Sequence, residues 1–329
     1  MDVDVCMGIF REYLCRCQED DNRLQDASEQ KRESGMPELE KGKKQSQSVG
    51  QRWLTAGIAI PIVLVFAWFG GWFAFVAILL IVVLNALELR AMLFHAGYRP
   101  LTSVSFGLSV LLLISAMVAQ YRLLIIEVGV GSALLISFLW LLFRKRLDGA
   151  MIDWALTLAI SIYLGWPMSC MLLLRGYGSG AFHLGSNQWL TLPSGVWWLL
   201  VVLLGVWGFD AAAFFSGRYF GRHRLAPMIS PAKTWEGVAG GMVLSIIACL
   251  VLTVVPLHVP WYLAVLLGVL IGGAATLGDL AESLLKRQTH VKDSGQIMPG
   301  HGGMLDRTDS ILFAAIVVYI FAQLLQVIG

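Results

Sequence analysis

Nine long runs of apolar residues divide this chain between residues 53 and 328. A helix needs roughly 20 apolar residues to cross the hydrocarbon layer of a bilayer, and most of these runs approach that length. Of the 329 residues, 57% are hydrophobic and only 14% are charged, which excludes an ordinary soluble domain. We therefore expect an all-α, polytopic integral membrane protein with about nine transmembrane helices, at approximately 53–69, 72–89, 103–120, 123–143, 152–174, 195–215, 237–256, 260–285 and 309–328.

The first 50 residues differ from the rest of the chain. They carry eight Lys or Arg and eleven Asp or Glu, with no sustained apolar period. Such a segment cannot bury enough apolar surface to offset the entropy lost on folding. We expect a hydrophilic, disordered cytoplasmic tail over 1–50, N-terminal transmembrane helices over 51–194, and a catalytic transmembrane region over 195–329, where the reactive polar residues are concentrated.

Positive charges are distributed unequally between the two sets of loops. With the N-terminus inside, the cytoplasmic loops hold fourteen Lys or Arg beyond the tail, and the opposite loops hold only Arg122 and Arg175. Lys and Arg gather on the cytoplasmic side of membrane proteins. This bias predicts a multi-pass protein of the inner, cytoplasmic membrane, with the polar loops 216–236 and 286–308 facing the cytoplasm.

Four acids lie at or beside the two ends of the polar loop at 286–308. Asp279 and Glu282 are three residues apart near the end of the eighth apolar run, so both carboxylates lie on one helix face. Ionised acids at membrane depth are costly and normally line a polar cavity. Asp306 and Asp309 stand at the start of the ninth run, and carboxylates are ligands that Mg²⁺ prefers. The two pairs can converge on one or two ions.

Two of these acids also have simpler interpretations. Glu282 and Lys286 have the i, i+4 spacing of an ordinary salt bridge on a helix surface. Asp309 can act as the N-cap of the last helix. Neither interpretation accounts for Asp279 or Asp306, so a polar site remains the better hypothesis.

The second polar loop, 216–236, offers groups suited to phosphate. Its SPAKTWEG segment provides hydroxyls and an ammonium group that can bind a polyphosphate. The glycines between 237 and 241 allow neighbouring helices to approach closely. The chain has neither a Walker loop nor a Gly-rich dinucleotide motif, which excludes the soluble classes of nucleotide site. The candidate binding residues here are Asp210, Arg218, Ser230, Lys233 and Thr234.

The polar residues from 283 to 309 form a pattern that resembles the signature of the phosphatidate cytidylyltransferase, or CDP-diacylglycerol synthase, family. The matching parts are S-x-x-K-R at 283–287, K-D at 292–293 and H-G-G-x-x-D-R-x-D at 301–309. The segments around Asp210 and SPAKTWEG are also similar, although Ala232 stands where the family commonly has Lys. The resemblance extends from the first apolar run to the C-terminus and is most specific over 205–310.

This resemblance implies transfer of CMP from CTP to phosphatidic acid, with release of pyrophosphate and a requirement for Mg²⁺; a second cation is left open. The catalytic residues that it implies are Asp279, Lys286, Asp306 and Arg307. The metal ligands that it implies are Asp279, Asp306, Glu282 and Asp309. The substrate-binding residues that it implies are Asp210, Arg218, Ser230, Lys233, Thr234, Ser283, Arg287, Lys292, His301, Gly302 and Gly303.

The expected partners are CTP, phosphatidic acid and membrane lipid, with no nucleic acid; a homodimer is left open. One alternative is a cytidylyltransferase or CTP-dependent kinase that acts on another lipid, such as a polyprenol. A second is a secondary transporter, since glycines interrupt the eighth run as in a broken helix. The acids cluster near one membrane face rather than at the midplane, which favours an enzyme over a transporter.

Overall fold

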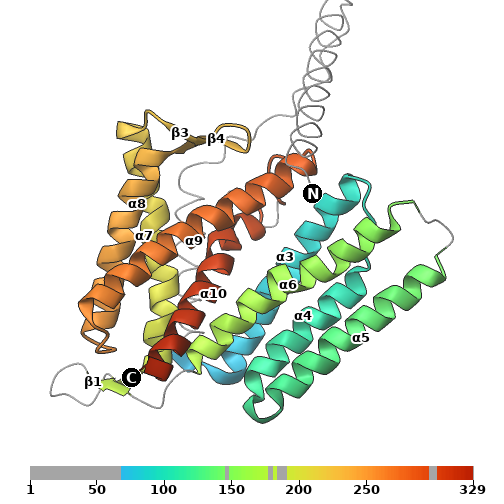
Figure 1. The fold of residues 1–329 in the computed structure, drawn as a ribbon, viewed down its shortest axis with the longest axis horizontal. Coiled ribbons are helices and arrows are strands. Elements are labelled where there is room, and N and C mark those ends of the chain that lie inside the picture. The colour runs from blue at the N-terminus through green and yellow to red at the C-terminus, as the bar shows by residue number, and fades with distance from the viewer. Residues whose placement is uncertain (1–67, 145–147, 177–180, 184–190, 296–301, 329) are drawn as a thin grey trace, which may run out of the picture. The chain divides into compact units, whose positions relative to one another are not determined.

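Eight α-helices form most of the structure, a computed structural model that describes residues 68–144, 148–176, 181–183, 191–295 and 302–328. Seven of them are long and apolar enough to cross a bilayer, and the remaining helix is shorter. Figure 1 shows the arrangement. The helices are α3 (Gly71–His95), α4 (Thr102–Met117), α5 (Arg122–Leu142), α6 (Ala150–Arg175), α7 (Ser194–Phe220), α8 (Trp235–Cys249), α9 (Trp261–Gln288) and α10 (Leu305–Ile328).

The expected all-α membrane fold is confirmed. Each of the eight predicted runs after residue 71 coincides with one helix, whereas the first run, 53–69, lies almost entirely outside the described residues. The short helix α4 has 16 residues, so at about 1.5 Å per residue it is shorter than the hydrocarbon layer. The count of nine crossings therefore stays a prediction.

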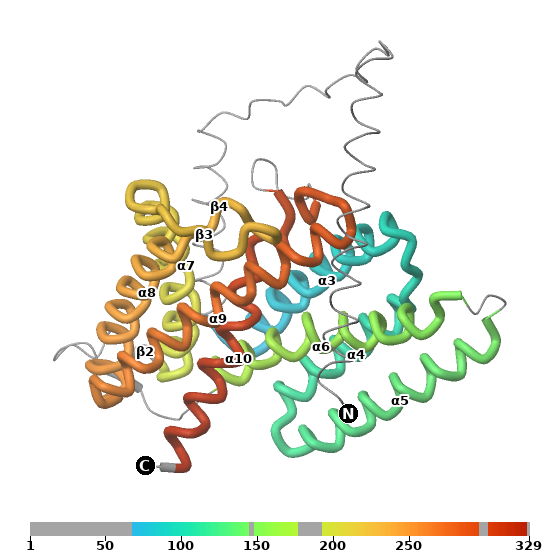
Figure 2. The backbone as a smooth tube through the Cα atoms, turned by 45° about the horizontal axis from the view of Figure 1, so that its top comes forward, coloured from blue at the N-terminus to red at the C-terminus, as the bar shows by residue number. Residues whose placement is uncertain are grey.

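The helices pack in two groups that meet at α6 and α10. One apolar core joins α7 and α9 to the C-terminal half of α6 and to α10. The second core joins α3 and α4 to α6 and α10. Figures 1 and 2 show the α7–α8–α9 group on one side and α4 and α5 on the other. Helix α10 therefore belongs to both cores, and a shift of α10 would disturb the packing of each.

Small residues let the helices around α9 approach one another. A Cβ atom on Gly241 of α8 would lie 2.7 Å from the ring of Phe209 on α7. A Cβ atom on Gly278 of α9 would overlap the carbonyl oxygen of Asp309 on α10. The close approach expected from the glycines at 237–241 is present, and Gly278 provides a second such contact beside two of the predicted acids.

Two short hairpins, absent from the all-α prediction, connect the helices. Strands β1 (Ala181–His183) and β2 (Thr191–Pro193) pair between α6 and α7. Strands β3 (Arg224–Ala226) and β4 (Ser230–Thr234) pair between α7 and α8, with Arg224 opposite Thr234. The remaining elements are a 3₁₀ turn at Ala119–Tyr121 and a π-helical turn at Leu250–Val254.

The two polar loops predicted at 216–236 and 286–308 are shorter than expected, because the helices extend into them. Helix α7 continues to Phe220, α9 continues to Gln288, and α10 already begins at Leu305. The polar residues near these ends are therefore held on helices. Helical backbone fixes their directions more tightly than a loop would.

Candidate active site

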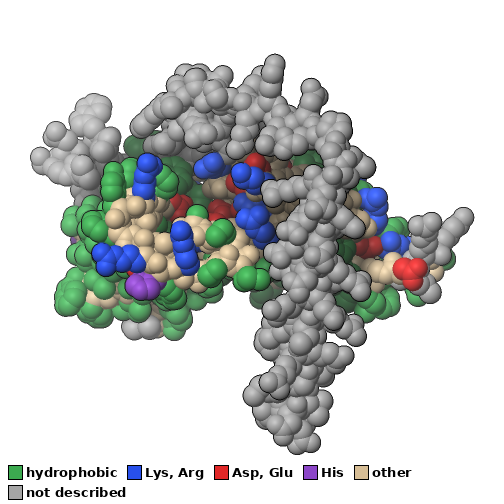
Figure 3. All heavy atoms as spheres, turned by 90° about the horizontal axis from the view of Figure 1, so that it is seen from above, with side chains coloured by type: hydrophobic (Ala, Val, Ile, Leu, Met, Phe, Trp, Pro, Cys, Tyr) green, Lys and Arg blue, Asp and Glu red, His purple; other side chains and the backbone are tan. Residues whose placement is uncertain are grey.

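A cavity of about 600 Å³ lies between the ends of α7, α8, α9 and α10 and the β3–β4 hairpin. Figure 3 shows Lys and Arg side chains gathered around this hollowed region, with carboxylates visible among them. Its lining contains many of the residues predicted from the sequence. They are Asp210, Arg218, Lys233, Thr234, Asp279, Glu282, Lys286, Asp306, Arg307 and Asp309.

Three carboxylates meet at the wall of this cavity. Asp279 and Glu282 on α9 and Asp309 on α10 each offer an oxygen, and these atoms lie within 4.8 Å of one another. The Glu282 side chain is only 1% exposed, yet its Oε1 atom has no hydrogen-bond partner among the described residues. Like charges this close repel strongly away from bulk water. An oxygen-only donor set with an unsatisfied buried oxygen fits a hard divalent cation such as Mg²⁺.

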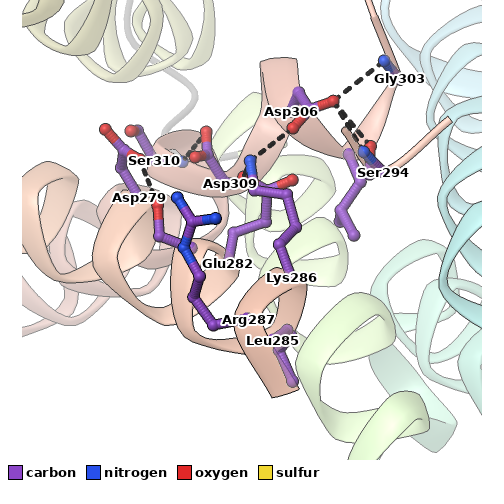
Figure 4. A network of polar contacts seen from close by, with 12 residues as sticks. Asp279, Glu282, Leu285, Lys286, Arg287, Ser294, Gly303, Asp306, Asp309 and Ser310 are labelled. Atoms are coloured by element: carbon purple, nitrogen blue, oxygen red, sulfur yellow. Dashed lines mark hydrogen bonds and ion pairs between the residues drawn. The ribbon is translucent and has the colours of Figure 1, made fainter. Parts of the chain in front are cut away.

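Two lysines lie against the acids. Lys286 Nζ is 2.7 Å from Glu282 Oε2 and 2.6 Å from Asp306 Oδ1. Lys233, on β4, places its Nζ 2.5 Å from Asp279 Oδ2. Figure 4 shows Lys286 between its two carboxylate partners. The site is thus a set of alternating positive and negative groups contributed by three separate elements.

Of the two simpler interpretations of the acids, the salt bridge is present and the N-cap is wrong. The i, i+4 salt bridge between Glu282 and Lys286 exists, but Glu282 belongs to the three-carboxylate group as well. The N-cap interpretation of Asp309 is wrong, because α10 begins four residues earlier, at Leu305. Asp309 lies on the second turn of that helix, with its Oδ1 atom accepting a hydrogen bond from Ser310 N at 2.7 Å.

Asp306 is separate from the three-carboxylate group. Its Oδ1 atom faces Lys286, and its Oδ2 atom accepts hydrogen bonds from Ser294 N at 3.1 Å, Ser294 Oγ at 2.9 Å and Gly303 N at 3.0 Å. The structure therefore groups Asp306 with Lys286 and the preceding loop. Its role as a metal ligand stays a prediction, whereas its contacts are those of an anchor for the lysine.

The predicted substrate-binding residues near the β3–β4 hairpin lie in different environments. Arg218 is an exposed residue of α7 at the cavity wall. Thr234 caps α8, because its side-chain oxygen accepts a hydrogen bond from Gly237 N at 3.2 Å. Arg287 Nε donates to the carbonyl oxygen of Ile229 at 3.2 Å, which ties α9 to the β3–β4 turn.

The other predicted binding residues lie at or beyond the edge of the cavity. Ser283 Oγ is 3.4 Å from Asp279 Oδ1, in position to orient that carboxylate. Lys292 is exposed, and neither it nor Ser230 belongs to the cavity lining. Gly302 and Gly303 precede α10, and Gly303 N contacts Asp306. His301 lies outside the described residues.

Comparison with known sequences places the chain in a family. The sequence model described as the cytidylyltransferase family matches residues 50–325. The chain belongs to this cytidylyltransferase family. A protein named phosphatidate cytidylyltransferase from Synechocystis sp. is 36% identical over 300 residues, covering 84% of this chain and 97% of the relative. A protein of the same name from Pseudomonas aeruginosa is 36% identical over 303 residues, covering 85% of this chain and 97% of the relative. The family suggested by the sequence motifs is thereby confirmed.

Two polar residues of this cytidylyltransferase family member were missed by the sequence analysis. Asn85 and Glu88 lie on α3, and both are buried beside the first turns of α10. The signal that could have found them is a pair of polar residues, three apart, at the end of the apolar run LLIVVLNALE. Such residues usually face the interior of a helix bundle. The sequence does not show which helix receives them.

Proposed function

We propose that this protein transfers CMP from CTP to phosphatidic acid, forming CDP-diacylglycerol and pyrophosphate. The observation that carries the proposal is the carboxylate–lysine array in a cavity formed by the polar ends of membrane helices. Membership of the cytidylyltransferase family supports it, since relatives aligned over most of this chain are named phosphatidate cytidylyltransferase.

The reaction needs little covalent help from the protein. A phosphate oxygen of phosphatidic acid attacks the α-phosphorus of CTP, and the bond from that phosphorus to the oxygen bridging it to the β-phosphate breaks. The attacking phosphate is already an anion, so no Ser or Cys nucleophile is required. The difficulty is to bring two polyanions together and to stabilise charge on the leaving pyrophosphate.

The three-carboxylate group provides the metal site in this proposal. Asp279, Glu282 and Asp309 would hold Mg²⁺, and their oxygen donors suit that ion. The chemistry supplied by bound Mg²⁺ is neutralisation and orientation of the phosphate groups. Glu282 is buried, and one of its oxygens has no hydrogen-bond partner among the described residues. This oxygen is therefore already desolvated and available to bind a metal ion.

The cationic side chains at the cavity would bind the phosphates. Lys233, Lys286, Arg218 and Arg307 come from four different elements around the same space. Lys286 is fixed between Glu282 and Asp306, so its ammonium group is oriented before substrate arrives. Donors fixed in advance stabilise developing charge without reorganisation at the moment of reaction.

The location of the cavity matches the two kinds of substrate. It lies at the polar ends of membrane helices, where a lipid headgroup and a dissolved nucleotide can meet. We further propose that this end faces the cytoplasm, because the loop cations are concentrated on that side of the predicted topology. In a bacterial cell this arrangement corresponds to the inner membrane.

The test is a reconstituted assay with purified protein in detergent micelles. We expect pyrophosphate release from CTP that requires phosphatidic acid and Mg²⁺, with CDP-diacylglycerol detected by mass spectrometry. The variant Asp279→Asn, made and purified in parallel, should be inactive and so exclude a contaminating enzyme. Release of CDP with a polyprenol would indicate a lipid kinase. Pyrophosphate release only with another lipid phosphate would reject phosphatidic acid as the substrate.

A further inference from the structure

Glu88 of α3 holds the start of the catalytic helix α10. Its Oε1 atom accepts a hydrogen bond from Met304 N at 2.8 Å, and its Oε2 atom accepts one from Leu305 N at 2.9 Å. The residue is 3% exposed, and more than 200 positions separate it from these partners along the chain. The first N–H groups of a helix have no partner within the helix, and a negative charge there is favourable. Glu88 satisfies both requirements from another helix.

A second polar contact fixes the same pair of helices one turn further along. Asn85 Nδ2 donates to Thr308 Oγ1 at 2.8 Å, and both residues are buried. Asn85 and Glu88 are three residues apart and therefore lie on one face of α3. This face therefore contacts α10 at its start and again on its first turns, which carry Asp306 and Asp309.

Ser294 connects Glu88 to the candidate active site. Its Oγ atom is 3.1 Å from Glu88 Oε2 and 2.9 Å from Asp306 Oδ2. The other oxygen of Asp306 contacts Lys286, which in turn contacts Glu282 of the carboxylate group. A continuous chain of polar contacts therefore leads from α3 to the three carboxylates. Figure 4 shows its second half, from Ser294 to Glu282.

The packing around Glu88 also accounts for a glycine in the H-G-G-x-x-D-R-x-D segment. A Cβ atom on Gly303 would overlap Ser294 Oγ and lie 2.5 Å from Glu88 Oε2. A Cβ atom on Gly295 would lie 2.6 Å from Glu88 Oε1. At these distances the Glu88 carboxylate and the added Cβ atom cannot both keep their positions. Glycine at positions 295 and 303 therefore leaves room for the Glu88 carboxylate where the structure places it.

We infer that Glu88 is a positioning residue for catalysis, which sets Asp306 and Lys286 in the active site through Ser294 and the start of α10. The inference rests on the proposed function and extends its machinery to a helix outside the 195–329 region. If Glu88 were only a structural cap, its loss would lower stability without selectively slowing the chemical step of the folded protein.

The kinetic test uses Glu88→Gln, which keeps the side-chain volume but replaces one acceptor oxygen by an NH₂ group and removes the charge. Because small misplacements of catalytic groups greatly reduce the rate of the chemical step, we expect kcat per folded protein to fall by about 10- to 100-fold. The KM for CTP should change by less than about threefold, as for an interaction realised mainly in the transition state. Glu88→Asp, which keeps the charge, should recover part of the loss. The control is Glu127→Gln, which changes a glutamate of α5, a helix that contributes no residue to the cavity lining, and which should behave like the wild type.

A double-mutant cycle tests the route through Ser294. If Glu88 acts through that hydroxyl, the variant Glu88→Gln/Ser294→Ala should be within about twofold of the worse single variant. Losses that multiply would show two independent effects and overturn the proposed route. A kcat of Glu88→Gln within about twofold of the wild type would overturn the positioning role itself.

A measurement without substrate separates this inference from the proposed function. If the wild type forms no CDP-diacylglycerol, the proposed function fails, and hydrogen exchange still tests whether Glu88 holds the start of α10. In Glu88→Gln, the backbone amides of Gly303, Met304 and Leu305 should exchange faster, because Glu88 binds two of them directly and Asp306 binds the third. Unchanged protection of all three amides would show that Glu88 does not hold this segment.

Discussion

Replacing Gly278 by Ala should impair catalysis by forcing α9 and α10 apart. The new Cβ atom would overlap the carbonyl oxygen of Asp309 and lie 3.0 Å from its carbonyl carbon and from Ser310 Cα. These are backbone atoms of α10, so no flexible side chain can move aside. Restoring ordinary contact distances requires a separation of roughly 1 Å.

The substitution Gly278→Ala would disturb the carboxylate group directly. Gly278 precedes Asp279, and the obstructing backbone is that of Asp309, so the displacement separates two members of the carboxylate group. A misplacement of about 1 Å can reduce turnover by about 100-fold. Overpacking costs about 1–3 kcal/mol of stability, and the better helix propensity of Ala returns about 1 kcal/mol of it.

The same helix provides a matched control. A Cβ atom added to Gly273 would meet no atom of the described residues within 4 Å beyond its immediate helix backbone, so Gly273→Ala gains the same helix propensity without moving a neighbour. The assay measures kcat and KM for CTP, together with the melting temperature in detergent. The reasoning fails if Gly278→Ala retains a kcat within about threefold of the wild type, or if Gly273→Ala loses as much activity.

Further substitutions address the charged groups and the topology. Asp279→Asn and Asp306→Asn should each abolish turnover in a folded protein. The double variant should be little worse than either, since the effects of residues that act as a unit are not additive. Near-normal activity of either single variant at saturating Mg²⁺ would contradict these roles. Lys233→Ala should raise the KM for CTP by about tenfold or more, and a defect confined to the lipid would assign this lysine to the other substrate. With the native thiols replaced, a Cys at the exposed Lys292 should be shielded from an impermeant reagent in intact cells, whereas a Cys at the exposed Gln120 should react; the reverse pattern would invert the topology.

The sequence by itself was enough to predict the membrane fold and the family. Hydropathy and helix length are local properties, so eight predicted runs coincide with helices even though their neighbours were unknown. The pairing of Asp279 with Glu282 was also predictable, because a spacing of three on one helix fixes their relative direction. The motif residues identified the family from their order and spacing alone.

Only the tertiary structure decided which acids meet and what holds them. The carboxylate group contains Asp309 rather than Asp306, because α10 begins at Leu305 and crosses α9 in contact with Gly278. Glu88 reaches this region only because α3 packs against α10, a contact between residues more than 200 positions apart. Periodicity shows which face of a helix is polar. It carries no information about the partner helix, the crossing point or the rotation, since these depend on how all the side chains pack together.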